Sequence, residues 1–126
     1  MRTVIHLPIP AHEHAKAAAE AFECAAVQGQ AYDMHRVLYA HQRGFATSTW
    51  TLLASEAGVR DAAAFRNCMA RSSGAIRIAA GVATASKLSV SATPTVMING
   101  WMFMPSEPEP ISVAVNAVLH GKSPKP

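Results

Sequence analysis

The stretch 90–100, which reads VSATPTVMING, carries the strongest structural signals in the sequence. Proline has no backbone N–H group, so Pro94 is expected at the beginning of a strand and not inside one. Residues 95–98 are β-branched or apolar, which is typical of a strand, and Asn99 with Gly100 is the preferred dipeptide of a two-residue hairpin turn. The sequence therefore predicts two antiparallel strands, over residues 95–98 and 101–104.

The hairpin carries a cluster of sulfur-containing and aromatic side chains: Met97, Trp101, Met102, Phe103 and Met104. The cluster is either a binding surface beside the proline or a sheet face covered by helices. Because side chains alternate across a strand, we expect alternate positions to lie in the core, with Trp101 and Phe103 as the exposed pair.

Before the hairpin, one short strand is followed by a block of helices. Residues 3–7 are mostly β-branched or apolar, as in a strand covered on both faces, and Pro8 and Pro10 end the segment. Apolar residues at three- and four-residue spacing then predict helices over residues 11–29, 31–42, 50–58 and 74–88, with another beginning after Asp61. A last helix is expected over residues 111–119. The order is strand, helices, antiparallel hairpin and C-terminal helix, which indicates the α/β class.

The composition is that of one globular domain. The chain has 126 residues, of which 50% are hydrophobic and 15% charged, so we expect one domain over residues 1–121 and a flexible tail over 122–126.

The 11 Lys and Arg residues are scattered along the chain, which argues against a nucleic-acid partner. No apolar stretch approaches the roughly 20 residues of a membrane span, and the N-terminus shows no signal peptide. We therefore expect no membrane partner, and the location stays open.

Two cysteines limit the redox chemistry of the chain. Thiol exchange of the thioredoxin type needs a thiolate at a helix N-terminus and a second cysteine nearby, and Cys24 and Cys68 satisfy neither condition in the sequence. They are either two buried thiols or one structural disulfide. We therefore assign no catalytic residue.

Histidines give no metal site and no cofactor is indicated. His12 and His14 flank a helix start, where the shared face of a strand is lost, and no third ligand has a recognisable spacing. His35 and His41 are six residues apart and do not face each other on a helix.

Several stretches resemble, in the same order, the DsbA-like thioredoxin family, which includes disulfide oxidoreductases. The resemblance covers almost all of residues 2–121. It rests on LPIP at 7–10, AFECAAVQG at 21–29, Tyr32 with His35 and Leu38, Leu53-Ala54 with Gly58-Val59, Phe65 before Cys68, and VSATPT at 90–95. In two places the sequence departs from the family: Ala92 stands where a glycine is common, and the strand and helix that carry Cys-x-x-Cys are absent from this chain.

The resemblance implies an incomplete thioredoxin-like α/β fold with an α-helical insertion. It also implies that Ala92, Thr93 and Pro94 form the loop that binds an extended peptide or a protein thiol, with Pro94 preceded by a cis bond. Some family members pair cysteines in this insertion, so a bridge between Cys24 and Cys68 stays a hypothesis. A periplasmic or other extracytoplasmic location would follow from the family, although a cytoplasmic one stays open.

In the topology that the resemblance implies, the absent first strand lies between residues 3–7 and 95–98. Its loss leaves two rows of backbone groups without partners. We expect the gap to be closed by pairing of the flanking strands, by a homodimer formed through the exposed strand edge, or by an upstream segment.

Three functions remain open on this reading, and whether the chain is an enzyme is undecided. The first is a relative of protein thiol-disulfide oxidoreductases that is redox-inactive as this chain, because Cys-x-x-Cys is absent. The second is a non-catalytic peptide-binding or self-associating module. The third is a relative that uses glutathione as an isomerase or transferase.

Overall fold

The computed structural model describes residues 5–8, 11–46, 48–105 and 108–125. These residues form six α-helices, one short 3₁₀ helix and a small two-stranded antiparallel sheet. The fold is thus mostly helical and belongs to the α/β class only loosely. The chain divides into two compact units, Met1–Ala85 and Ser86–Pro126. The expected single domain over residues 1–121 and the flexible tail over 122–126 stay predictions.

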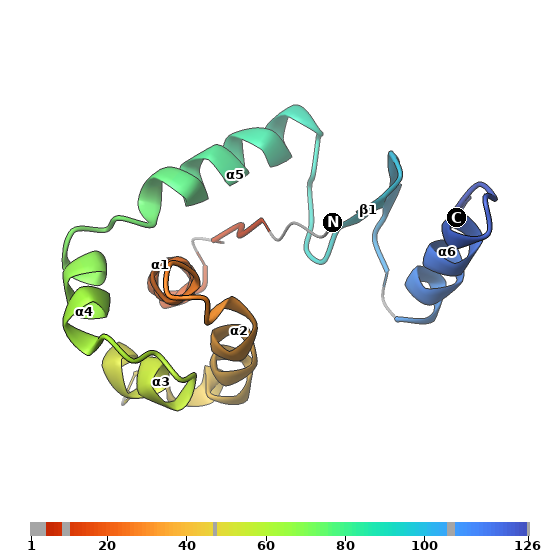
Figure 1. The fold of residues 1–126 in the computed structure, drawn as a ribbon. Coiled ribbons are helices and arrows are strands. Elements are labelled where there is room, and N and C mark those ends of the chain that lie inside the picture. Colours follow the sequence, from red (N-terminus) through yellow and green to blue (C-terminus); the bar gives the residue numbers. More distant parts are fainter. Residues whose placement is uncertain (1–4, 9–10, 47, 106–107, 126) are drawn as a thin grey trace. The chain divides into compact units, whose positions relative to one another are not determined.

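The first unit consists of helices joined by short turns (Figure 1). They are α1 (Ala15–Ala26), α2 (Ala31–Ala40), the 3₁₀ helix η1 (Gln42–Gly44), α3 (Trp50–Glu56), α4 (Ala62–Ala70) and most of α5 (Ala75–Lys87). All five helices expected between residues 11 and 88 are confirmed. Helix α1 packs against α2, α3 and α4, and α3 packs against both α2 and α4.

Two of the helix starts follow from capping side chains. The Thr49 hydroxyl accepts a hydrogen bond from the Leu52 N–H at 3.3 Å, and the Asp61 carboxylate accepts one from the Ala64 N–H at 2.8 Å. Each cap satisfies one of the backbone donors that a helix N-terminus leaves free. The starts of α3 and α4 are therefore fixed by the local sequence.

Small side chains let the helices of the first unit approach one another closely. Ala21 and Ala25 of α1 are fully buried, and so is Met34 of α2, which packs in the same core. An alanine face loses almost no side-chain entropy on burial and permits short distances between helix axes. The other residues of this core are Cys24, Val37, Leu38, Leu53, Ala54, Ala57, Val59 and Phe65.

The prediction of a strand over residues 3–7 is wrong for the part that the structure describes. Residues 5–7 form no strand, and residues 3 and 4 lie outside the described residues. A strand requires a hydrogen-bonded neighbour. The only sheet among the described residues is formed by two other segments, so apolar composition alone does not make residues 5–7 a strand.

The second unit contains strands β1 (Val96–Ile98) and β2 (Trp101–Phe103) and helix α6 (Glu109–Leu119). The strands are antiparallel, with Val96 opposite Phe103. Asn99 and Gly100 have φ angles of +50° and +86°, which is the left-handed backbone that a tight hairpin turn requires. The predicted hairpin is confirmed, and so is the last helix, which packs against β1.

The predicted exposure of the hairpin side chains is partly wrong. Trp101 is 40% exposed as expected, but Phe103 is only 6% exposed, whereas Met104 is 63% exposed. Phe103, Ala114 of α6 and Pro124 are the buried residues of the described second unit. Phe103, and not Met104, is thus the hairpin side chain that this unit buries.

Candidate functional site

The loop before β1 is one candidate site. Ala92, Thr93 and Pro94 are all exposed, and the peptide bond between Thr93 and Pro94 is cis. The Thr95 hydroxyl donates a hydrogen bond of 2.6 Å to the Ala92 carbonyl, which ties the two ends of the loop together. An exposed backbone that leads into a strand offers N–H and C=O groups to an extended peptide.

The two cysteines lie in the first unit. Cys24 of α1 and Cys68 of α4 are joined in a disulfide, with their Cα atoms 5.8 Å apart and a separation of 44 positions in sequence. Cys24 is 1% exposed and belongs to the core, and Cys68 packs against that core. The bridge therefore fastens α1 to α4 from the inside of the helical unit.

This bridge determines which thiol chemistry the chain offers. No cysteine is free, so the bridged chain has no thiolate to attack a substrate disulfide. A buried sulfur is also hard to reach for an attacking thiol. The two cysteines thus form a bridge between two helices, with Cys24 in the core, and not an exposed Cys-x-x-Cys pair.

Three histidines that were considered as metal ligands from the sequence, His12, His14 and His41, lie in different surroundings. His12 is exposed, His14 makes an edge contact with the ring of Phe45 at 6.2 Å, and the His41 Nε2 atom lies 2.9 Å from the carboxylate of Glu56. Within the part of the chain that the structure describes, no three His, Cys, Asp or Glu side chains are placed to hold a metal ion.

A second candidate site, which the sequence did not indicate, lies in the first unit. It is a pocket of about 830 Å³ between residues 5–6 and the helices α1, α2 and α5. Its lining residues are spread between positions 5 and 84, and no short motif connects them. Such a site is visible only after folding, although a histidine inside the apolar segment 3–7 is an unusual residue choice.

His6 is a partly buried ionisable residue that lines this pocket. Its Nε2 atom is buried without a hydrogen-bond partner. Burial lowers the pKa of the His6 imidazole below 6.5, the nearby Glu23 carboxylate opposes this shift, and His35 adds to it. The neutral ring is thus the form that the fold accommodates.

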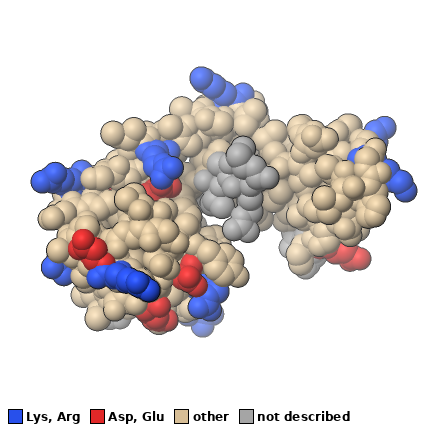
Figure 2. Space-filling view, viewed as in Figure 1, with Lys and Arg blue, Asp and Glu red and all other residues tan. Residues whose placement is uncertain are grey.

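The surface charges are mixed on the face of the first unit seen in Figure 2, where Lys and Arg lie among Asp and Glu. Among the described residues, no helix is both long enough and apolar enough to cross a membrane.

Comparison with known proteins identifies similar proteins and a matching family. The chain is 37% identical over 123 residues to a protein of Salinispora arenicola named Na(+)/H(+) antiporter NhaA 1, an alignment that covers 96% of this chain and 19% of that protein. It is 42% identical over 96 residues to Na(+)/H(+) antiporter NhaA 3 of Salinispora tropica, covering 75% of this chain and 15% of that protein. The chain thus spans less than a fifth of either relative.

No solved structure matches the chain. The family described as thioredoxin, in its DsbA-like form, matches residues 1–117. This match includes the exposed loop at Pro94, both bridged cysteines and the whole helical unit. The chain therefore belongs to the DsbA-like thioredoxin family.

Proposed function

We propose that this chain is a peptide-binding module of the DsbA-like type that performs no thiol-disulfide exchange by itself. The observation that carries the proposal is that both cysteines of the chain are bound to each other, with Cys24 in the core. The loop formed by Ala92, Thr93 and Pro94 is exposed beside a strand. Binding to this loop needs no thiol from the chain.

The names of the relatives support a proposal about context. Both are called Na(+)/H(+) antiporters, and this chain corresponds to a small share of each. We propose that the module accompanies a transporter of this kind and binds a segment of it or of another protein. A disulfide persists in an oxidising compartment, so the bridge supports an extracytoplasmic position for the module.

The sheet suggests how a partner could bind. In the described residues β1 pairs with β2 alone, and an isolated two-stranded hairpin is only marginally stable in water. We propose that the fold is an incomplete thioredoxin-like one in which the free edge of β1 accepts a further strand. A second copy of the chain is the alternative donor of this strand, and light scattering distinguishes a dimer from a monomer.

The loop is tested by fluorescence anisotropy with a labelled extended peptide whose single cysteine is S-methylated. Thr93→Glu places a larger charged side chain where the peptide backbone should approach, and we expect affinity to fall at least about tenfold. Asn116→Glu adds the same charge at an exposed position of α6 and should leave affinity within about twofold. Equal affinity of the two variants would contradict binding at the loop.

A further inference from the structure

The hairpin carries three methionines that the proposed peptide binding does not use. Met97 lies in β1, Met102 lies in β2, and Met104 follows directly after β2. Met97 is 43% exposed and Met104 is 63% exposed, while Met102 is half-buried. We call these three side chains the methionine face. Small solutes can contact this face from solution.

The register of the two strands brings the methionines together. Met97 is directly opposite Met102 in the antiparallel pair, and such side chains share a face of the sheet with their Cβ atoms about 4.5–5.5 Å apart. Met104 comes two positions after Met102, and a step of two along a strand returns to the same face. Met104 is thereby a diagonal neighbour of Met97, at a distance of about 7–8 Å.

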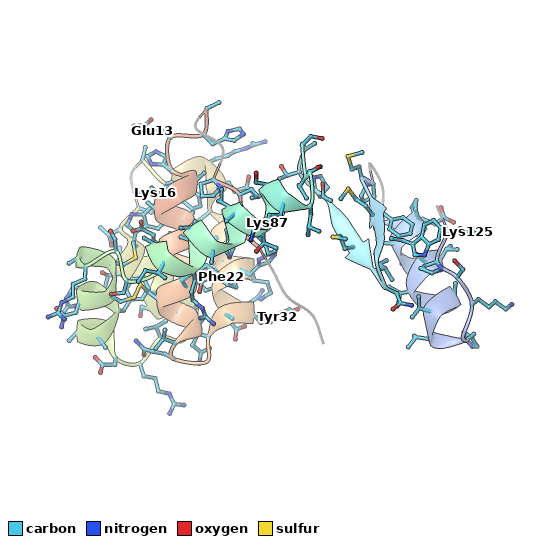
Figure 3. All side chains as sticks on the ribbon, turned by 90° about the horizontal axis from the view of Figure 1, so that it is seen from above. Glu13, Lys16, Phe22, Tyr32, Lys87 and Lys125 are labelled. Carbon is cyan, nitrogen blue, oxygen red and sulfur yellow. A yellow bond between two sulfur atoms is a disulfide. The ribbon has the colours of Figure 1, made fainter. Side chains whose placement is uncertain are left out.

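The two faces of the hairpin differ in what they expose. The face opposite to the methionines contains Phe103, which is paired with Val96 and is only 6% exposed. In Figure 3 the sulfur atoms beside the two strands, drawn in yellow, lie on the side away from α6. The hairpin thus buries an aromatic side chain on one face and exposes thioether groups on the other.

Thioether groups select one class of metal ion. A thioether sulfur is a soft, polarizable ligand and binds soft ions such as Cu(I). Calcium and magnesium ions require oxygen ligands, and zinc is bound by Cys, His or carboxylate side chains. Residues 90–105 contain no Asp, Glu, His or Cys. The hairpin therefore offers ligands for a soft ion without the groups that bind a harder one.

The properties of methionine also suit a site in this particular chain. Its side chain has three rotatable bonds, so three sulfur atoms can converge on one ion from the spacing that the register gives. A thioether carries no proton and forms no disulfide. It therefore stays available as a ligand in an oxidising compartment, where the two cysteines of the chain are bridged.

We propose that Met97, Met102 and Met104 together bind one Cu(I) ion through their sulfur atoms. The site uses other residues than the loop at Pro94, so it goes beyond the proposed function and stands or falls separately from it.

The first test is a titration with Cu(I), kept reduced by ascorbate, in competition with the coloured chelator bicinchoninate. We expect the wild-type chain to bind one Cu(I) ion and to bind no Zn(II) at comparable concentration. Met102→Leu keeps an apolar side chain of similar volume but removes the sulfur. It should weaken Cu(I) binding at least about tenfold, because even the loss of a group that only orients a ligand costs about 10–100-fold.

Met69→Leu is the matched control, because it removes a thioether that packs against the core of the first unit. It should change the Cu(I) affinity less than about twofold. Equal Cu(I) affinity of the wild-type chain and Met102→Leu would overturn the proposal, and so would an equal loss in Met102→Leu and Met69→Leu. Far-UV circular dichroism checks that both variants fold.

The triple variant Met97→Leu/Met102→Leu/Met104→Leu separates a metal site from an apolar docking surface. Leucine is as apolar as methionine, so a protein segment that packs on this face would still bind the triple variant. Cu(I) requires the sulfur atoms and should not bind it. A triple variant that keeps the Cu(I) affinity of the wild-type chain would contradict the metal site.

NMR spectra of the methionine methyl groups locate the ion without relying on a variant's stability. Cu(I) is diamagnetic, so the methyl signals of the methionine face should shift together until one equivalent is bound. The signals of Met34 and Met69 should stay in place. Shifts confined to these two, or Cu(I) binding that disappears in Cys24→Ala/Cys68→Ala, would place the ion elsewhere and overturn the proposal.

The pH dependence of binding gives a further check on the kind of ligand. Histidine and cysteine ligands must lose a proton to bind a metal, so sites built from them weaken as the pH falls. A thioether site should show the same shifts in the methyl spectra at about pH 7.5 and pH 5.5. Loss of the bound ion at the lower pH would contradict a site made of methionines.

Discussion

At the scale of single residues, His6 is a polar side chain that its apolar neighbours in sequence do not predict. It lies in an apolar segment, its Nε2 atom is buried without a partner, and its pKa is lowered chiefly by burial. Leaving a buried polar atom without a partner costs free energy of folding.

The lowered pKa predicts a pH dependence of stability. Because the folded state holds the His6 pKa below 6.5, the unfolded chain binds more protons as the pH falls through this range, and the free energy of unfolding decreases. Stability from this group is complete well above 6.5 and is lost as the pH drops through the folded-state pKa. Urea unfolding between pH 7.5 and 5 should therefore show a larger decrease for the wild-type chain than for His6→Phe.

The same variant should also be more stable at neutral pH. Phenylalanine keeps a ring beside Phe22 and removes the unsatisfied nitrogen, which should raise the free energy of unfolding by about 1 kcal/mol. A His6→Phe chain with unchanged stability and an unchanged pH profile would show that the His6 ring is solvated and not buried.

At the scale of secondary-structure elements, a side chain at the end of α1 organises the turn before α4. The Gln28 side-chain amide donates to the Asp61 carbonyl at 3.0 Å and accepts from the Asp61 N–H at 3.1 Å. The Asp61 side chain in turn caps α4. Gln28 and Asp61, which are 33 positions apart in sequence, thus connect the end of α1 to the start of α4, a link that no local pattern predicts.

The cap is tested by a pair of substitutions at one position. Asp61→Ala removes the acceptor for the Ala64 N–H and should lower the free energy of unfolding by about 1 kcal/mol, whereas Asp61→Asn keeps an equivalent cap and should lower it by much less. Chemical denaturation measures both. Equal destabilisation by Ala and Asn would mean that the charge matters and the cap does not.

The bridge between α1 and α4 is tested by reduction. Closing a loop of 44 residues stabilises the folded state by about 4 kcal/mol in the chain-entropy model. Dithiothreitol should therefore lower the melting temperature of the wild-type chain and leave that of Cys24→Ala/Cys68→Ala unchanged. A wild-type melting temperature that does not respond, with the thiols shown to be free, would contradict a stabilising bridge.

Local signals predicted most elements but not their partners. The local signals are the helix caps Thr49 and Asp61 and the hairpin turn at Asn99 and Gly100. They act on backbone groups close by in the sequence, and the elements that they predict are present. The predictions are wrong where tertiary packing decides the outcome: Phe103 is buried, and residues 5–7 have no neighbouring strand in the described residues. The pocket combines side chains from four segments, so its geometry follows only from tertiary packing.

At the scale of the whole molecule, this chain belongs to a family that includes disulfide oxidoreductases, but its sequence lacks a Cys-x-x-Cys motif. Residues 1–117 match the family, but both cysteines are joined in a bridge within the helical unit. Family membership describes the scaffold, whereas activity depends on the residues at the site. We therefore propose binding at the Pro94 loop and no redox turnover by this chain.

The most direct test is catalytic oxidation of a reduced dithiol peptide in the presence of an oxidant, followed by loss of free thiol. We expect the wild-type chain and Cys24→Ala/Cys68→Ala to give the same rate as the reaction without protein. Multiple turnovers by the wild-type chain that disappear in the double variant would contradict it, because Cys24 and Cys68 would then be a redox centre.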